Sequence, residues 1–102
     1  KQTIPERIPE PDRTWLALAA YNVGFGHLED ARVLTQGRGG DPDRWDAVRE
    51  TLPLLAQERW FTQTRRGYAR GWEPVGFVRN VQTYAELLKW MIAEAPQEGT
   101  VP

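Results

Sequence analysis

Residues 15–26 read WLALAAYNVGFG in one-letter code, and this stretch decides the fold. Its first six residues are all apolar, which is typical of a helix packed among other helices rather than lying on a surface. Gly24 and Gly26 then interrupt the pattern, because glycine lets the backbone turn sharply or approach another group closely. The stretch predicts a buried helix that ends in a tight turn and presents Tyr21 and Asn22 in its last turn.

Two helices are expected to meet at this turn. Aspartate is a favoured helix-capping residue, so Asp12 predicts a first helix from about Arg13 to Asn22. The second helix is expected over residues 27–36. Its predicted apolar stripe comprises Leu28, Ala31, Val33 and Leu34, and its predicted outward side chains are Glu29, Asp30 and Arg32. A glycine-rich loop at residues 37–42 follows.

Three more helices are expected after this loop. Asp41 or Asp43 is expected to cap a short helix that stops near Pro53, and residues 54–63 are expected to form another. Gly67 and Gly71 mark a bend. The last helix is expected to have Pro74 in its first turn and to end before Pro96. Its apolar residues recur at spacings of three and four, namely Phe77, Val78, Val81, Tyr84, Leu88 and Ile92.

These patterns predict an all-α chain with one small lobe. The 102 residues allow one small domain, divided into a proline-rich lead-in (1–11), a helical lobe (12–95) and a polar tail (96–102). The net charge of −1 gives no general attraction to nucleic acid, and no apolar run is long enough to span a membrane. Because the chain starts at Lys1 without a methionine, we expect it to be an excised fragment, a processed product or the ordered part of something longer.

Several residue types are absent or too few for common kinds of site. The chain has no cysteine, and its single histidine excludes a histidine-rich metal site, so no metal or cofactor is expected. The cluster of Arg65, Arg66, Arg70 and Tyr68 has two interpretations, a site for an anionic peptide stem or glycan and an ordinary solvated surface. Tyr21 and Asn22 also have two interpretations, a locally bonded helix end and a ligand-binding pair, because polar groups that end an apolar helix need partners.

Two motifs in order resemble one family. Ala20-Tyr21-Asn22 followed by Gly24 resembles a motif of the superfamily of goose-type lysozymes and soluble lytic transglycosylases. The segment from Glu73 to Tyr84 resembles a second motif of that superfamily, with Phe77 where tyrosine is usual and Pro74 beside the glutamate. The intervening segments LEDAR (28–32), LPLL (52–55) and GYARG (67–71) resemble the membrane-bound lytic murein transglycosylase F subfamily.

This resemblance, over about residues 12–92, implies the C-terminal half of a lysozyme-like helical domain and a lyase that acts on peptidoglycan. The family cleaves the β-1,4 bond between N-acetylmuramic acid and N-acetylglucosamine and forms 1,6-anhydromuramic acid. One glutamate acts first as acid and then as base. That glutamate belongs to a motif upstream of the alanine-tyrosine-asparagine motif, which is absent here, so no catalytic residue is assigned in this chain. Substrate-binding roles transfer by motif to Tyr21, Asn22, Glu73 and Tyr84.

The resemblance also implies a cellular setting. The expected partners are peptidoglycan glycan strands, the N-terminal half of the same catalytic domain, and an upstream regulatory domain like a solute-binding protein. The expected location is the periplasmic side of the outer membrane. Two other interpretations stay open, a non-catalytic glycan-binding helical module and a helical interaction domain whose tryptophans form a protein interface.

Overall fold

The computed structural model describes residues 2–94, and within this range it contains helices and loops without strands. The helices are α1 (Asp12–Val23), α2 (Phe25–Gly37), α3 (Trp45–Thr51), the 3-10 helix η1 (Leu52–Ala56), α4 (Glu58–Phe61) and α5 (Trp72–Glu94). The all-α prediction is therefore confirmed for this part of the chain. None of the helices within it is both long enough and apolar enough to cross a membrane. The expected polar tail, residues 96–102, lies outside the described residues.

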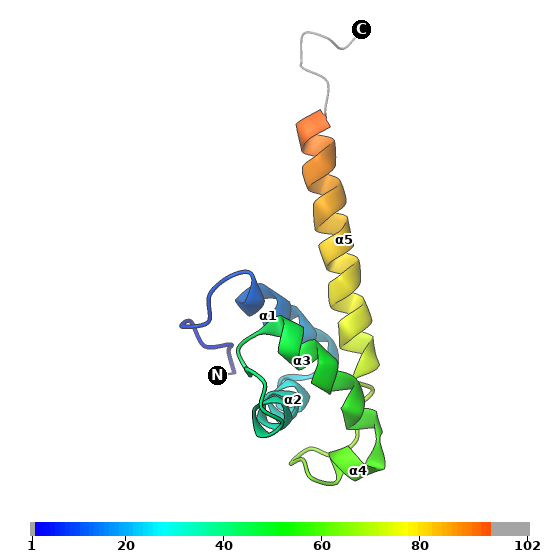
Figure 1. Cartoon of the computed structure of the whole chain (residues 1–102). Coiled ribbons are helices and arrows are strands. Elements are labelled where there is room, and N and C mark those ends of the chain that lie inside the picture. Colours follow the sequence, from blue (N-terminus) through cyan, green and yellow to red (C-terminus); the bar gives the residue numbers. More distant parts are fainter. Residues whose placement is uncertain (1, 95–102) are drawn as a thin grey trace, which may run out of the picture.

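One small core joins the shorter helices to the first half of α5. α1 packs against α2, α3 and α5, while the second half of α5 projects away from the other helices (Figure 1). The buried apolar side chains are Ile8, Leu16, Ala19, Leu28, Ala31, Leu34, Trp45, Val48, Leu52, Leu55, Ala69 and Val78. Ile8 is only 1% exposed, so the proline-rich lead-in packs against the helices.

The first helix begins one residue earlier than expected, and the predicted cap was wrong. Asp12 is the first helical residue, and its carboxylate instead accepts a hydrogen bond from the Trp45 N–H (3.1 Å) and pairs with Arg44 (3.3 Å). The free Thr14 N–H donates to the carboxylate of Glu10 (3.0 Å). Asp12 thus joins α1 to the start of α3, while Glu10 satisfies a donor at the helix N-terminus.

The faces predicted for α2 were partly wrong. Val33 is exposed, whereas Arg32 and Asp30 are buried. Arg32 lies four residues after the core residue Leu28, and side chains at that spacing share one helix face. Asp30 lies on another side of α2, where the loop after α4 covers it and donates the Arg65 and Arg66 N–H groups to its carboxylate.

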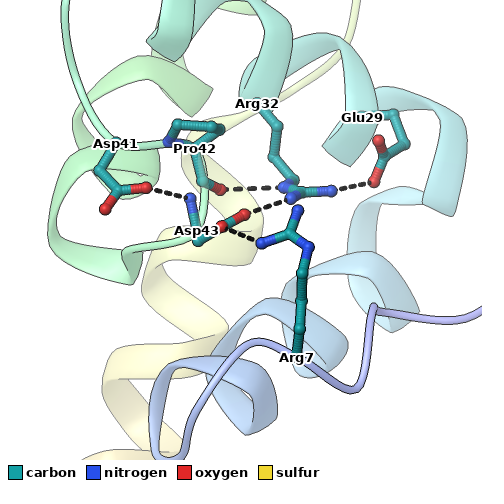
Figure 2. Close-up of polar contacts among 6 residues, drawn as sticks. All are labelled: Arg7, Glu29, Arg32, Asp41, Pro42 and Asp43. Atoms are coloured by element: carbon teal, nitrogen blue, oxygen red, sulfur yellow. Dashed lines mark hydrogen bonds and ion pairs between the residues drawn. The ribbon is translucent and has the colours of Figure 1, made fainter.

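Arg32 is tolerated at this face because acidic and carbonyl oxygens surround it (Figure 2). Its guanidinium donates to Glu29 (2.9 Å), to Asp43 (2.6 Å) and to the Pro42 carbonyl (2.9 Å). Asp43 also accepts from Arg7 of the lead-in. Neither Asp41 nor Asp43 therefore caps α3; this ionic cluster ties the lead-in, α2 and the α2–α3 loop together, and a buried charge needs such partners.

The single helix expected over residues 54–63 is two short helices. Gln57, between η1 and α4, has an extended backbone (φ −103°, ψ 129°) that interrupts helical hydrogen bonding. Beyond α4 the chain returns to η1, where the Ala69 N–H donates to the Leu55 carbonyl (3.0 Å). The backbone of Gly71 also comes very close to Leu52, since a Cβ added to Gly71 would lie 1.7 Å from the Leu52 carbonyl oxygen.

The last helix, α5, begins at Trp72, and Pro74 lies in its first turn as predicted. Its apolar spacing was expected to bury six large side chains, and this expectation was wrong. Val78 is buried and Phe77 and Val81 are half-buried, but Tyr84, Leu88 and Ile92 are exposed. The apolar stripe therefore continues beyond the part of α5 that the other helices cover.

The ionic cluster gives folding a specific pH dependence. Hydrogen bonds from Arg7 and then from Arg32 hold the pKa of the Asp43 carboxyl below its ordinary value of 3.8. Because the pKa of Asp43 is lower in the folded state, its ionised carboxylate stabilises the fold at pH values above its ordinary pKa. This stabilisation is lost as the pH falls through the pKa of the folded state. We expect Asp43→Asn to lower the urea unfolding midpoint at about pH 7, and this effect to shrink as the pH falls below 3.8. Asp46→Asn is the control because Asp46 is 75% exposed, and an equal pH dependence for both variants would contradict the assignment.

The close approach at Gly71 makes a second prediction. Gly71→Ala places its methyl group on the Leu52 carbonyl, so we expect a loss of about 3 kcal/mol in unfolding free energy. Gly76→Ala is the matched control, because a Cβ at Gly76 meets nothing within 4 Å. That variant should gain about 0.5–1 kcal/mol, since alanine favours a helix interior over glycine. Similar urea midpoints for the two variants would show that the backbone contact is not tight.

Candidate functional site

The junction between α1 and α2 presents Tyr21 to solvent. Gly24 adopts a φ of +103°, a conformation that L side chains rarely adopt, and its N–H donates to the Ala20 carbonyl (2.8 Å). α2 then begins immediately at Phe25. Tyr21 is 84% exposed, and its ring centroid lies 6.4 Å from that of Phe77 on α5. The predicted helix end and tight turn are therefore present, and they place Tyr21 beside α5.

Tyr21 lines the larger of two grooves around this junction. This Tyr21 groove has a volume of about 590 Å³. One wall is the lead-in, through Gln2, Thr3, Ile4 and Glu6, and the other is α1 and the start of α2, through Arg13, Ala17, Ala20, Tyr21 and Phe25. Small alanine side chains beside an exposed aromatic ring leave a shallow surface suited to contact with a flat ligand.

The second groove brings two of the predicted site residues together. This Asn22–Glu73 groove has a volume of about 240 Å³ and is lined by Asn22, Val23, His27, Tyr68, Ala69, Arg70 and Glu73. The residues come from the end of α1, the start of α2, the loop before α5 and the first turn of α5. An amide, an imidazole, a phenol, a guanidinium and a carboxylate therefore surround one small space, which suits a polar ligand.

Glu73 forms an ion pair in this groove. Its carboxylate pairs with the Arg70 guanidinium (2.9 Å), and the two side chains are 46% and 60% exposed. The Arg70 guanidinium also lies over the Trp72 ring, with its carbon 5.5 Å from the ring centroid. The pair is accessible to solvent and to ligands.

Tyr84 lies on the same side of α5 as Phe77, but lines neither groove. It follows Phe77 by seven residues, which is about two helical turns and about 10 Å along the axis. Its side chain is 68% exposed. Tyr21 contacts Phe77, and Tyr84 continues the Phe77 side of α5 to a position where the side chain is exposed.

The basic cluster seen in the sequence separates in space. The backbone N–H groups of Arg65 and Arg66 donate to the buried Asp30 carboxylate (3.3 and 2.9 Å). The Arg66 side chain covers Gly26, where an added Cβ would lie 2.6 Å from its Nε atom. Arg70 and Tyr68 are the members of the cluster that line the Asn22–Glu73 groove. The sequence signal for this groove was the pair of glycines, Gly67 and Gly71, because they shape the loop that carries Arg70.

The acidic residues near His27 have structural partners. Asp30 accepts from the loop after α4, and Glu29 pairs with Arg32. The Nδ1 atom of His27 is buried and has no hydrogen-bond partner among residues 2–94. Within the same range, three or more metal-binding side chains do not gather at any point.

Curated relatives support the resemblance seen in the two motifs. The chain is 57% identical to membrane-bound lytic murein transglycosylase F of Hahella chejuensis over 99% of its own length, and 67% identical to the protein of that name from Marinobacter nauticus over 83%. It is 60% identical to the one from Ectopseudomonas mendocina over 97%. No protein-family model matches the chain.

The chain therefore matches a segment of lytic murein transglycosylase F. The expected family resemblance is confirmed, and identities this high over most of the chain extend well beyond the two motifs. The chain spans 17–20% of the length of these relatives, about one fifth. The roles of Tyr21, Asn22, Glu73 and Tyr84 are not tested by these comparisons and stay predictions.

Proposed function

We propose that this chain is the C-terminal lobe of the catalytic domain of a peptidoglycan lytic transglycosylase. The parent enzyme would cleave the β-1,4 bond between N-acetylmuramic acid and N-acetylglucosamine and form a 1,6-anhydromuramic product. The observation that carries this proposal is the 57–67% identity to relatives named for murein transglycosylase activity. The exposed rings of Tyr21 and Tyr84, on either side of the half-buried Phe77, support it because they offer one wall of a cleft.

The proposed reaction needs one carboxyl group that changes role. As an acid, it protonates the glycosidic oxygen while the bond from C1 of the muramyl sugar breaks. As a base, it then removes the proton from the C6 hydroxyl, whose oxygen bonds to C1, so no water is consumed. Such an acid works near neutral pH only if its pKa is raised.

We propose that this acid is a glutamate upstream of Lys1. The carboxyl groups of Glu10 and Asp43 are unsuited to this role, because hydrogen bonds lower their pKa. Hydrogen bonds from the Thr14 hydroxyl and backbone lower the pKa of Glu10, and Arg7 and Arg32 lower that of Asp43. These environments favour the charged carboxylate, which is the opposite of what a proton donor needs.

The four motif residues then have distinct roles in the proposed cleft. The Tyr21 hydroxyl would bond the upstream acid or the substrate, and the Asn22 amide would hold a substrate amide. Glu73 would accept hydrogen bonds from sugar hydroxyls at the edge of the Asn22–Glu73 groove. Tyr84 would line the cleft farther along α5 and orient the acid.

The uncovered half of α5 is proposed to pack against the N-terminal half of the same catalytic domain. Its exposed apolar side chains are Tyr84, Leu87, Leu88, Trp90, Met91 and Ile92. A continuous apolar surface of this kind marks an interface. The remaining proposed partners are peptidoglycan strands and an upstream regulatory domain like a solute-binding protein, and the proposed location is the periplasmic side of the outer membrane.

The packing proposal predicts a stability effect that depends on chain length. In this 102-residue chain, Leu88→Ser should change the unfolding free energy by less than about 0.5 kcal/mol, because Leu88 is half exposed. In a longer protein that includes the upstream half-domain, the same change should cost about 2 kcal/mol. Leu16→Ala, at a fully buried position, should cost about 2–5 kcal/mol in both. Urea unfolding measures each value, and a neutral Leu88→Ser in the longer protein would reject the packing proposal.

Product analysis of digested sacculi tests the activity. The purified chain should release no anhydromuropeptides, whereas the longer protein should release them. In the longer protein, Tyr84→Phe should lower the rate about tenfold, because one hydroxyl that bonds the acid or substrate is lost. Thr83→Val is the matched control, since it removes a hydroxyl from an exposed neighbouring position of α5.

Two results would contradict the assignment. Release of anhydromuropeptides by the short chain would place an acid within it. A longer protein that binds chitooligosaccharides, seen by tryptophan fluorescence, but releases no anhydro product would instead favour the non-catalytic glycan-binding module.

A further inference from the structure

The ionic cluster and the Tyr21 groove are connected through the lead-in. Arg7 of this segment pairs with Asp43 but does not line the Tyr21 groove. The Ile8 N–H donates to the Pro5 carbonyl (3.2 Å), so a turn joins the buried Ile8 to the residues before it. Those residues form one wall of the groove, the lead-in wall, which comprises Gln2, Thr3, Ile4 and Glu6. The contact that holds Arg7 therefore also influences where the lead-in wall lies.

Asp43 is a fixed anchor for Arg7 (Figure 2). One of its carboxylate oxygens accepts from the Arg32 guanidinium (2.6 Å), and its N–H donates to the Asp41 carboxylate (2.9 Å). The other carboxylate oxygen accepts from Arg7. Because Arg32 is buried in the helical lobe, Asp43 keeps its place when its contact with Arg7 opens. The side of the contact that can move is the lead-in.

Few other contacts hold the lead-in wall. Ile4 is partly buried against the core, and the Glu6 carbonyl accepts a long hydrogen bond from the Arg13 guanidinium (3.4 Å). The other wall side chains are exposed. The Arg7 side chain is itself 65% exposed, so salt screens its ion pair and the pair opens readily. A segment with so few buried contacts opens locally before the rest of the fold.

We propose that the Arg7–Asp43 ion pair is an electrostatic latch that sets the width of the Tyr21 groove. When the latch is closed, the lead-in wall faces Ala17 and Ala20 of α1. When it opens, the turn at residues 5–8 lets the wall move away from α1 while Ile8 stays in the core. A ligand held between the two walls would then lose the contacts of one wall. Arg7 is thus a positioning residue, which acts on the groove through the backbone of the lead-in.

A nitroxide label on the lead-in wall measures the width of the groove in the 102-residue chain. The chain has no cysteine, so Thr3→Cys supplies a single attachment site at an exposed position. At about 0.02 M salt, the label should broaden the NMR methyl signals of Ala17 and Ala20 on the facing wall. Raising the salt to about 0.5 M should weaken this broadening, because the Debye length falls from roughly 20 Å to about 4 Å. Arg7→Gln should weaken the broadening at low salt and abolish its salt dependence.

Hydrogen exchange gives the size of the effect. The Ile8 N–H is bonded within the turn, so its exchange follows the opening of the lead-in. Arg7→Gln should make the Ile8 amide exchange about two- to fivefold faster, which is the effect expected from loss of an exposed ion pair.

Two further variants separate the latch from general effects of charge. Arg7→Lys keeps the positive charge, and it should restore most of the broadening and its salt dependence. Arg49→Gln is the matched control, because it removes an exposed ion pair within α3, the pair of Arg49 with Asp46 (3.8 Å). It should leave the broadening unchanged.

Three results would overturn the latch. Unchanged broadening in Arg7→Gln would show that Ile4 alone holds the lead-in wall. Faster Ile8 exchange without weaker broadening would assign the ion pair to stability rather than to groove width. An equal salt dependence in the labelled parent and in Arg7→Gln would place the screened contact elsewhere. None of these results depends on whether the longer protein releases anhydromuropeptides.

Discussion

The packing of α1 against the first half of α5 is the contact on which the rest of the structure depends. Leu16 and Ala19 of α1 and Val78 of α5 are buried in one core cluster. Because an α-helix repeats every 3.6 residues, burying that face of α1 turns Tyr21 outward beside Phe77. The same packing places the end of α1 next to the first turn of α5, where Asn22 and Glu73 share a groove. The candidate site is therefore a consequence of how two helices bury their apolar faces.

The second half of α5 shows how a core can be shared between segments. Packing of an apolar face supplies most of the stability of a helix in a protein. In α5, the other helices cover that face only over its first half. The stripe that holds Phe77 and Val78 against α1 continues unbroken through Tyr84 and Leu88. The apolar stripe of α5 that packs against α1 continues into the uncovered half. We therefore interpret the uncovered half as a surface for another lobe of the same domain. Tyr84 would complete a cleft at that surface.

Most helices and the tight turn followed from local patterns. The expected burial of α1 was partly wrong, because only Leu16 and Ala19 of this helix are buried and Tyr21 is exposed. The predicted faces of α2 were wrong where a charged residue occupies a buried position. Arg32 shares the face of Leu28 and is buried because Glu29, Asp43 and the Pro42 carbonyl satisfy its charge. Asp30 is buried because a distant loop donates two backbone N–H groups to it. No rule that treats every charged side chain as outward-facing could predict either position.

The sequence alone determined the all-α class, the positions of most helices and the two motifs that resemble lytic transglycosylases, because helical periodicity and glycine breaks are local properties. Only the tertiary structure decided which charged groups have structural partners and which remain accessible. Asp43 pairs with Arg7, and Asp30 accepts a hydrogen bond from the Arg66 N–H, each across 36 residues of sequence, whereas the Arg70–Glu73 pair stays accessible at a groove. Such pairings depend on how distant segments fold together, since burial and ion-pair geometry are set by through-space distance rather than by sequence spacing.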